Sequence, residues 1–124
     1  MTLNNSEWEI LNMSYIPVST ESALSACSAI DLGATVQLAI TASNDYGASN
    51  TSAARVKLYT SINNLTWDSD AYATFDNNLS VGSTIRTTVP VCPDPRYMKI
   101  RVENLDGTYN ISNVVISITQ KYIS

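Results

Sequence analysis

The sequence predicts an all-β fold: an antiparallel two-sheet β-sandwich of about eight strands, jelly-roll-like in its connections. Helical periodicity is almost absent, while apolar and polar residues alternate with a period of two in several segments. Clusters of turn-forming residues separate these segments. Strands with one apolar face each require two sheets packed face to face. The length of 124 residues is that of a single domain, so residues 1–124 are expected to form one sandwich.

The first 17 residues are the least regular part of the chain. A short strand is expected at Trp8–Met13, and the segment either forms the first strand or projects as an N-terminal arm. Its apolar residues include Trp8, Ile10, Leu11 and Ile16. A joint rich in Ser and Thr follows at Val18–Ser25, and a second weak strand is expected at Ser28–Leu32.

The remaining strands are predicted by alternation. In Tyr97–Asn104, for example, Met98, Ile100 and Val102 share one face, while charged side chains occupy the other. A weaker strand is expected at Tyr72–Phe75. The segments with clear alternation are Thr35–Ser43, Arg55–Ile62, Thr84–Val91, Tyr97–Asn104 and Asn113–Ile123.

Two turn signals are specific. Asn63-Asn64 predicts a tight hairpin between Ser61-Ile62 and Leu65-Thr66-Trp67, because Asn tolerates a positive φ. Pro90 and Pro93 flank Val91-Cys92, so the strand there either ends or runs along a sheet edge.

Composition and charge exclude several classes of function. The net charge is −4 and no stretch concentrates Lys or Arg, so nucleic acid is not an expected partner. No segment is long and apolar enough to cross a membrane as a helix. Histidine is absent, which removes the commonest general base and the usual zinc ligand set. We therefore expect a protein that is not an enzyme and needs no metal or cofactor.

The cysteines allow two interpretations. Cys27 and Cys92 lie 65 positions apart and have no CxxC spacing. A bridge between them would contribute about 4 kcal/mol in an oxidising compartment. Alternatively, both are buried thiols that act as small apolar side chains.

Three groups of residues are candidates for binding. Trp67, Tyr72 and Tyr46 lie in or beside expected loops, where aromatic rings would stack on a glycan, although Trp67 alternatively closes one end of the sandwich. Carboxylates in the Asp68–Asp76 region either bind calcium or cap turns. If their strands are neighbours, one basic-aromatic face is formed by Lys57, Tyr59, Tyr97, Lys99 and Arg101.

Two segments resemble known β-sandwiches. Val56–Asp70 resembles a hairpin common in discoidin-like and other jelly-roll sandwiches, with a strand, Thr-Ser, a turn and a Trp. Tyr97–Thr119 is similar to the closing hairpin of the same sandwiches. The combination also looks like small structural proteins of tailed-phage virions. That resemblance implies a capsid decoration or a tail-associated component that docks on a larger assembly.

The expected function is therefore structural. We expect a homo-oligomer that contacts capsid or tail proteins, with Trp8, Ile10, Leu11 and Ile16 as the assembly contact. Residues 1–9 lack the basic and apolar regions of a signal peptide, so we expect synthesis in the host cytoplasm and a place in the virion. The alternatives are an extracellular location and a carbohydrate-binding module that recognises surface glycans through Trp67, Tyr72 and Tyr46.

Overall fold

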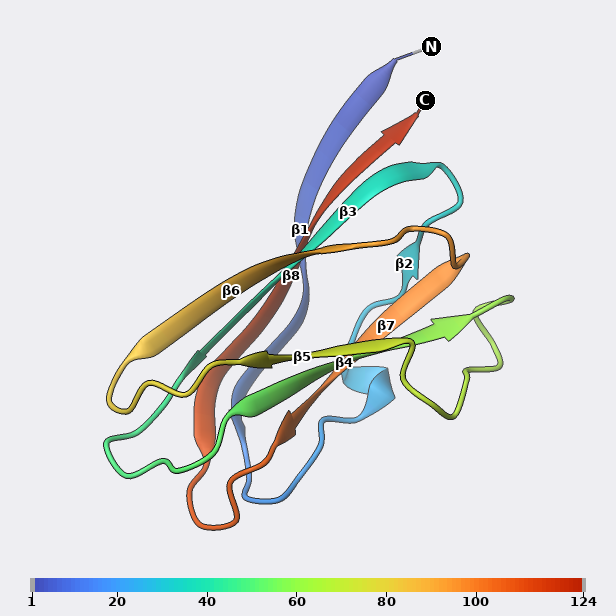
Figure 1. Cartoon of the computed structure of the whole chain (residues 1–124). Coiled ribbons are helices and arrows are strands. Elements are labelled where there is room, and N and C mark those ends of the chain that lie inside the picture. Colours follow the sequence, from blue (N-terminus) through green and yellow to red (C-terminus); the bar gives the residue numbers. More distant parts are fainter. Residues whose placement is uncertain (1, 124) are drawn as a thin grey trace.

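The computed structural model describes residues 2–123 as two four-stranded antiparallel sheets with one short 3-10 helix, η1 (Leu24–Ala26) (Figure 1). Sheet A has the strand order β1-β8-β3-β6, and sheet B has the order β2-β7-β4-β5. The strands are β1 (Leu3–Ile16), β2 (Ile30–Asp31), β3 (Thr35–Asp45), β4 (Ala54–Ser61), β5 (Ala73–Asn77), β6 (Thr84–Val91), β7 (Tyr97–Asn104) and β8 (Ile111–Ile123).

This strand order is that of a jelly roll, because most consecutive strands alternate between the two sheets and all ladders are antiparallel. The predicted all-β sandwich of about eight strands is confirmed. The expected alternative between a first strand and a projecting arm is resolved as a strand, since β1 pairs with β8 from Leu3 to Ile16.

The strands β6 and β7 have the bounds that the alternation predicted, and the others differ at their ends. β1 begins at Leu3, five residues before the expected Trp8, because its polar beginning pairs with the end of β8. β2 retains only Ile30–Asp31 of the expected strand. An alternating pattern marks which residues face the core, and it does not mark where backbone pairing stops.

The expected tight hairpin after β4 is wrong in part. Asn64 does adopt a positive φ of 62°, but no strand follows at Leu65–Trp67. The side chain of Asn63 accepts the N–H groups of Leu65 and Thr66, each at 2.9 Å, so these donors are used locally and not in a ladder. β4 pairs instead with β5, which begins at Ala73.

The core lies between the two sheets and follows the predicted alternation. Leu38, Ile40 and Ala42 of β3 face Val56 and Leu58 of β4, and each is at most 4% exposed. The inward residues of β7 and β8 are buried in the same cluster: Met98, Ile100, Val102, Ile111, Val114, Ile116 and Ile118. Burial of this apolar surface is the main contribution to stability.

One end of sheet A extends beyond sheet B. The beginning of β1 and the end of β8 lie side by side, with Leu3 opposite Ile123, and the beginning of β3 joins them at Thr35. Figure 1 shows this three-stranded ribbon running past β2 and β7 towards both chain ends. Ser6, Gln120 and Tyr122 lie on the ribbon and, unlike Ile116 and Ile118, are only partly buried. The ribbon therefore offers surface that no second sheet covers.

Candidate functional site

Sheet A has two edge strands of substantial length, β1 and β6. Each pairs with one neighbour only, β1 with β8 and β6 with β3. β1 is regular from Leu3 to Glu9, after which a bulge shifts its register. β6 is regular from Thr84 to Val89, after which Pro90 lacks a backbone N–H. Each edge thus presents a regular segment of similar length that is able to pair with another strand.

The two edges differ in charge. Glu7 and Glu9 are exposed on β1, and Arg86 is exposed on β6. Glu7 and Arg86 line the same shallow depression on the outer face of sheet A. Neither residue makes an ion pair within residues 2–123. Opposite charges therefore lie on opposite edges of one sheet face, and none of them forms an ion pair within residues 2–123.

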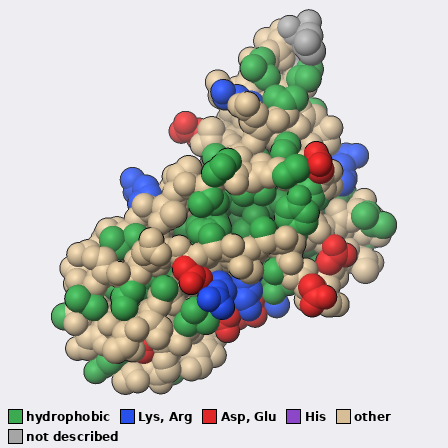
Figure 2. Space-filling model, viewed as in Figure 1, with side chains coloured by type: hydrophobic (Ala, Val, Ile, Leu, Met, Phe, Trp, Pro, Cys, Tyr) green, Lys and Arg blue, Asp and Glu red, His purple; other side chains and the backbone are tan. Residues whose placement is uncertain are grey.

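An apolar hollow separates β6 from β5. Figure 2 shows hydrophobic side chains gathered in a depression between these two strands. Phe75 of β5 and three residues of β6, Ile85, Val89 and Val91, are only partly buried against the core. At one end the hollow is closed by Asn77, whose amide nitrogen donates to the carbonyl of Ile85 at 3.0 Å. The sandwich is thus open along the side where β5 and β6 are both edge strands.

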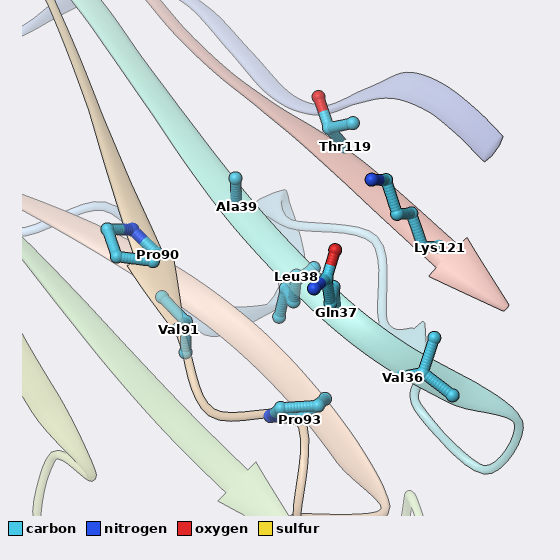
Figure 3. Close-up of a pocket in the computed structure, with 9 residues that line it drawn as sticks. All are labelled: Val36, Gln37, Leu38, Ala39, Pro90, Val91, Pro93, Thr119 and Lys121. Carbon is cyan, nitrogen blue, oxygen red and sulfur yellow. The ribbon is translucent and has the colours of Figure 1, made fainter.

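A groove of about 400 Å³ continues this apolar surface at the end of β6 (Figure 3). Pro90 and Val91 end β6 and Pro93 follows it, and all three lie beside Val36 and Leu38 of β3 in the groove. Pairing between β3 and β6 begins only at Leu38, so Val36 lies beyond the ladder and is 43% exposed. The groove is mainly a hydrophobic surface, and its one charged lining residue, Lys121, comes from β8.

The outer face of sheet B carries the expected basic-aromatic cluster. β4 and β7 are neighbours, and their register places Lys57 opposite Arg101, and Tyr59 opposite Lys99. The guanidinium carbon Cζ of Arg101 lies 5.6 Å from the ring centroid of Tyr59. The ladder thus confirms that the predicted residues share one face.

Carboxylates neutralise much of this face. The Lys57 ammonium lies 3.0 Å from a Glu103 carboxylate oxygen and 3.5 Å from a Glu21 carboxylate oxygen. The Arg101 Nη1 lies 3.8 Å from the Glu21 Oε2. Basic and acidic side chains appear together below β5 and β4 in Figure 2. Much of the positive charge is therefore compensated within the chain, which weakens its attraction for an acidic partner.

The four predicted assembly residues divide into two groups. Ile10, Leu11 and Ile16 are at most 3% exposed and belong to the core of the sandwich. Their apolar character is explained by folding, and in the folded chain they offer no surface to a neighbour. Trp8 is 36% exposed and lies opposite Ile118 in the β1–β8 ladder. Of the four, Trp8 is the residue that remains a candidate for an assembly contact.

The three predicted glycan-binding aromatics do not form one platform. Tyr46 is 3% exposed, and its hydroxyl accepts the Ala54 N–H at 2.8 Å and donates to the carbonyl of Asn77. Trp67 is partly buried beneath Lys99, whose nitrogen lies 5.4 Å from the indole centroid. Tyr72 is 46% exposed. Tyr46 is thus a structural residue, while Trp67 and Tyr72 keep accessible ring surface.

The cysteines and the acidic loop have separate environments. Both thiols are free: Cys27 is buried and Cys92 is exposed. Burial raises the pKa of Cys27, so this thiol is less reactive than an ordinary one. Asp68 accepts a hydrogen bond from Thr60 at 2.9 Å, and Asp76 pairs with Arg55 at 2.9 Å. Within residues 2–123 no three metal-ligating side chains gather into one group.

The described segment 2–123 contains no helix with the length and hydrophobicity needed to span a membrane. No protein-family model matches the sequence, and no curated protein matches it. One solved structure with similarity is described as "Bacillus endospore appendages form a novel family of disulfide-linked pili". It has a TM-score of 0.45 and 12% sequence identity, and the match covers 98% of this chain and 90% of that chain. Similarity at this level supports no conclusion about function.

Proposed function

We propose that this protein is a non-enzymatic structural subunit whose copies associate edge to edge through sheet A. The observation that carries the proposal is the pair of exposed edge strands, β1 and β6, in one sheet. Monomeric β proteins commonly protect such edges with short strands, prolines or inward charges, because an open edge is a template for another strand. β1 has 14 residues and contains no Pro or Lys, and its ladder is interrupted by one bulge, after Glu9.

The direction of the strands suits a repeated contact. Sheet A has an even number of antiparallel strands, so β1 and β6 run in opposite directions. A second copy in the same orientation therefore places its β1 antiparallel to β6 of the first copy. Such a contact joins two different surfaces, and repeating it extends the array without closing it. The same placement brings Glu7 and Glu9 of one copy towards Arg86 of its neighbour.

The edges of sheet B are less suited to this role. β2 has two residues and β5 has five, so each offers few backbone groups for pairing. A role as a capsid decoration or tail component of a virion is the finer form of the proposal, and an extracellular array is its alternative. In both settings the subunit needs a repeated contact and no catalytic group.

A charge exchange tests the edge contact. Light scattering after size exclusion gives the native mass of the wild type, Glu7→Lys/Glu9→Lys, Arg86→Glu and the triple variant. We expect the wild type to exceed the monomer mass as concentration rises. Each one-sided reversal places like charges together and lowers the mass, and the triple variant restores it because opposite charges face each other again.

Lys121→Glu is the matched control, because Lys121 lies on sheet A but on β8, which is not an edge strand. It is expected to keep the wild-type mass. A wild type that remains monomeric at all concentrations overturns association between copies. An assembled wild type whose mass is unchanged by either reversal places the contact elsewhere. Detection of the protein by mass spectrometry in purified virions would separate the virion setting from an extracellular one.

A further inference from the structure

A polar cleft of about 540 Å³ lies where the ribbon of sheet A meets the loops of sheet B. One wall is formed by Ser6 of β1 and by Gln120 and Tyr122 of β8. The facing wall is formed by Asp31 at the end of β2 and by Arg96, which directly precedes β7. The cleft shares no residue with the predicted glycan site, and it lies apart from the groove beside β6.

Contacts with two residues orient the guanidinium of Arg96. Its Nε and Nη2 donate to the two carboxylate oxygens of Asp31 at 2.9 and 3.3 Å. Its Cζ lies 5.0 Å from the ring centroid of Tyr97. Gly33 leaves room for this group, since a Cβ added there would lie 3.1 Å from both Cζ and Nε of Arg96. A guanidinium that is both paired and stacked is oriented before any ligand arrives, and a side chain at position 33 would displace it.

Asp31 and Gln120 connect the two walls. The N–H of Gly33 donates to Asp31 Oδ1 at 2.9 Å, while the amide nitrogen of Gln120 donates to the backbone carbonyl of Asp31 at 2.9 Å. The same nitrogen donates to Thr35 Oγ1 at 2.5 Å. The amide oxygen of Gln120 accepts no hydrogen bond from residues 2–123 and is available as an acceptor.

The charges in the cleft compensate each other. The hydrogen bond from Arg96, followed by that from Gly33, lowers the pKa of Asp31, so the carboxylate is ionised at neutral pH beside the guanidinium. Among residues 2–123, Asp31 and Arg96 are the charged residues that line the cleft. A ligand with a large net charge would therefore gain little, whereas a neutral ligand rich in hydrogen-bonding groups finds both donors and acceptors.

We propose that this cleft binds a neutral saccharide, with Arg96 and Asp31 recognising neighbouring hydroxyl groups of one sugar ring. A sugar hydroxyl donates and accepts at the same time, which matches a guanidinium placed next to a carboxylate. The Gln120 amide oxygen and the hydroxyls of Ser6 and Tyr122 supply further partners, and the Tyr122 ring supplies an apolar surface for the sugar C–H groups. The proposal goes beyond the structural role and does not depend on association between copies.

A printed array of neutral, sulfated and sialylated oligosaccharides tests the proposal with the full chain. The strongest neutral oligosaccharide is then titrated by calorimetry against variants whose folding is checked by circular dichroism. We expect Arg96→Ala and Gly33→Val to weaken binding at least about tenfold, since each removes or displaces charge-assisted hydrogen bonds. Gln120→Ala is expected to weaken it less.

Arg55→Ala is the matched control, because Arg55 forms a similar ion pair with Asp76, at 2.9 and 3.4 Å, on another face. It is expected to bind as the wild type does. The proposal is overturned if no neutral oligosaccharide binds or if only charged glycans bind. It is also overturned if binding survives both Arg96→Ala and Gly33→Val. Loss of binding in Trp67→Ala, with binding kept in Arg96→Ala, would place the site on the loop between β4 and β5.

Discussion

Asp106 connects separate segments at one end of the sandwich. Its side chain is buried and accepts the N–H groups of Thr51 at 2.7 Å, Thr108 at 2.8 Å and Tyr109 at 3.0 Å. The bond from Thr51, then that from Thr108, holds the pKa of Asp106 well below its ordinary value of 3.8, while burial opposes them. The ionised carboxylate therefore stabilises the loops before β4 and β8.

This environment predicts how stability depends on pH. A carboxyl whose pKa is lower in the folded state stabilises the fold above its unfolded pKa, and this contribution is lost as the pH falls. The free energy of unfolding should therefore decrease below about pH 4. Asp106→Asn should be less stable at neutral pH and should flatten that decrease. Urea titrations at about pH 7, 5 and 3 measure both effects.

Asp94→Asn, a change at an exposed carboxylate, serves as the control and should leave the pH profile close to that of the wild type. If the free energy of unfolding of Asp106→Asn fell with decreasing pH as steeply as that of the wild type, other carboxylates would cause the acid sensitivity.

The buried hydroxyl of Tyr46 is also expected to contribute to the free energy of unfolding. This hydroxyl joins Ala54 of β4 to Asn77 of β5, so Tyr46→Phe leaves a donor and an acceptor without this partner. We expect the free energy of unfolding to fall by about 1–3 kcal/mol in chemical denaturation. Tyr109→Phe, at a residue that is 43% exposed, should change it little. Equal stability of Tyr46→Phe and the wild type would contradict this account.

The structural role of Tyr46 was not predictable from its neighbours in sequence. Tyr46 follows the turn-forming pair Asn44-Asp45, which is typical of an exposed loop. Its partner Asn77 lies 31 positions away, so the contact exists only once β3 and β5 have been placed. The alternation of Met98, Ile100 and Val102, in contrast, depends only on local sequence and predicted their burial correctly.

At the scale of elements, β1 combines a core segment with an exposed segment. The sequence predicted its strand character from Trp8–Met13, but Trp8, Ile10, Leu11 and Ile16 were all assigned to an assembly contact. Apolar residues at the start of a chain satisfy either role, and only burial distinguishes them. Ile10 is 3% exposed and therefore serves the core, whereas Trp8 is 36% exposed and keeps surface for a contact.

Two substitutions separate these roles. Ile10→Asp places a carboxylate in the core and should lower the free energy of unfolding by about 3–5 kcal/mol. Trp8→Ala removes a partly exposed ring and should cost about 1 kcal/mol or somewhat more. Thermal denaturation measures both effects, and native mass then reports assembly for the folded Trp8→Ala. Stable folding of Ile10→Asp would contradict the position of β1 in the core.

Across the whole molecule, alternation predicted two sheets and most strands, but it did not predict which strands would be edges. Only Pro90 gave such a signal, and β6 is indeed an edge strand. Residues of the polar cleft come from β1, β2, β8 and the segment before β7, so no local motif marks them. The hollow between β5 and β6 likewise depends on how far the two sheets diverge there.

The proposed edge contact predicts a dependence on ionic strength. Attraction between exposed charges is screened over about 10 Å at 0.1 M salt and over about 3 Å at 1 M. Association through Glu7, Glu9 and Arg86 should therefore weaken as salt is raised, while the folded state persists. Sedimentation velocity across a salt series measures the assembled fraction. An assembled fraction that rises with salt would favour an apolar contact, such as one through the hollow between β5 and β6.

The pairing of β1 with β8 also has a consequence for biosynthesis. Among the eight described strands, β1 is made first and its ladder partner β8 is made last, with Leu3 opposite Ile123. Ile10, Leu11 and Ile16 cannot be buried in the complete core until β8 has been made and sheet A has formed. Until β8 has been made, β1 thus has no ladder partner in sheet A. A chaperone that binds β1 until β8 has been made would therefore protect this strand from pairing with other chains.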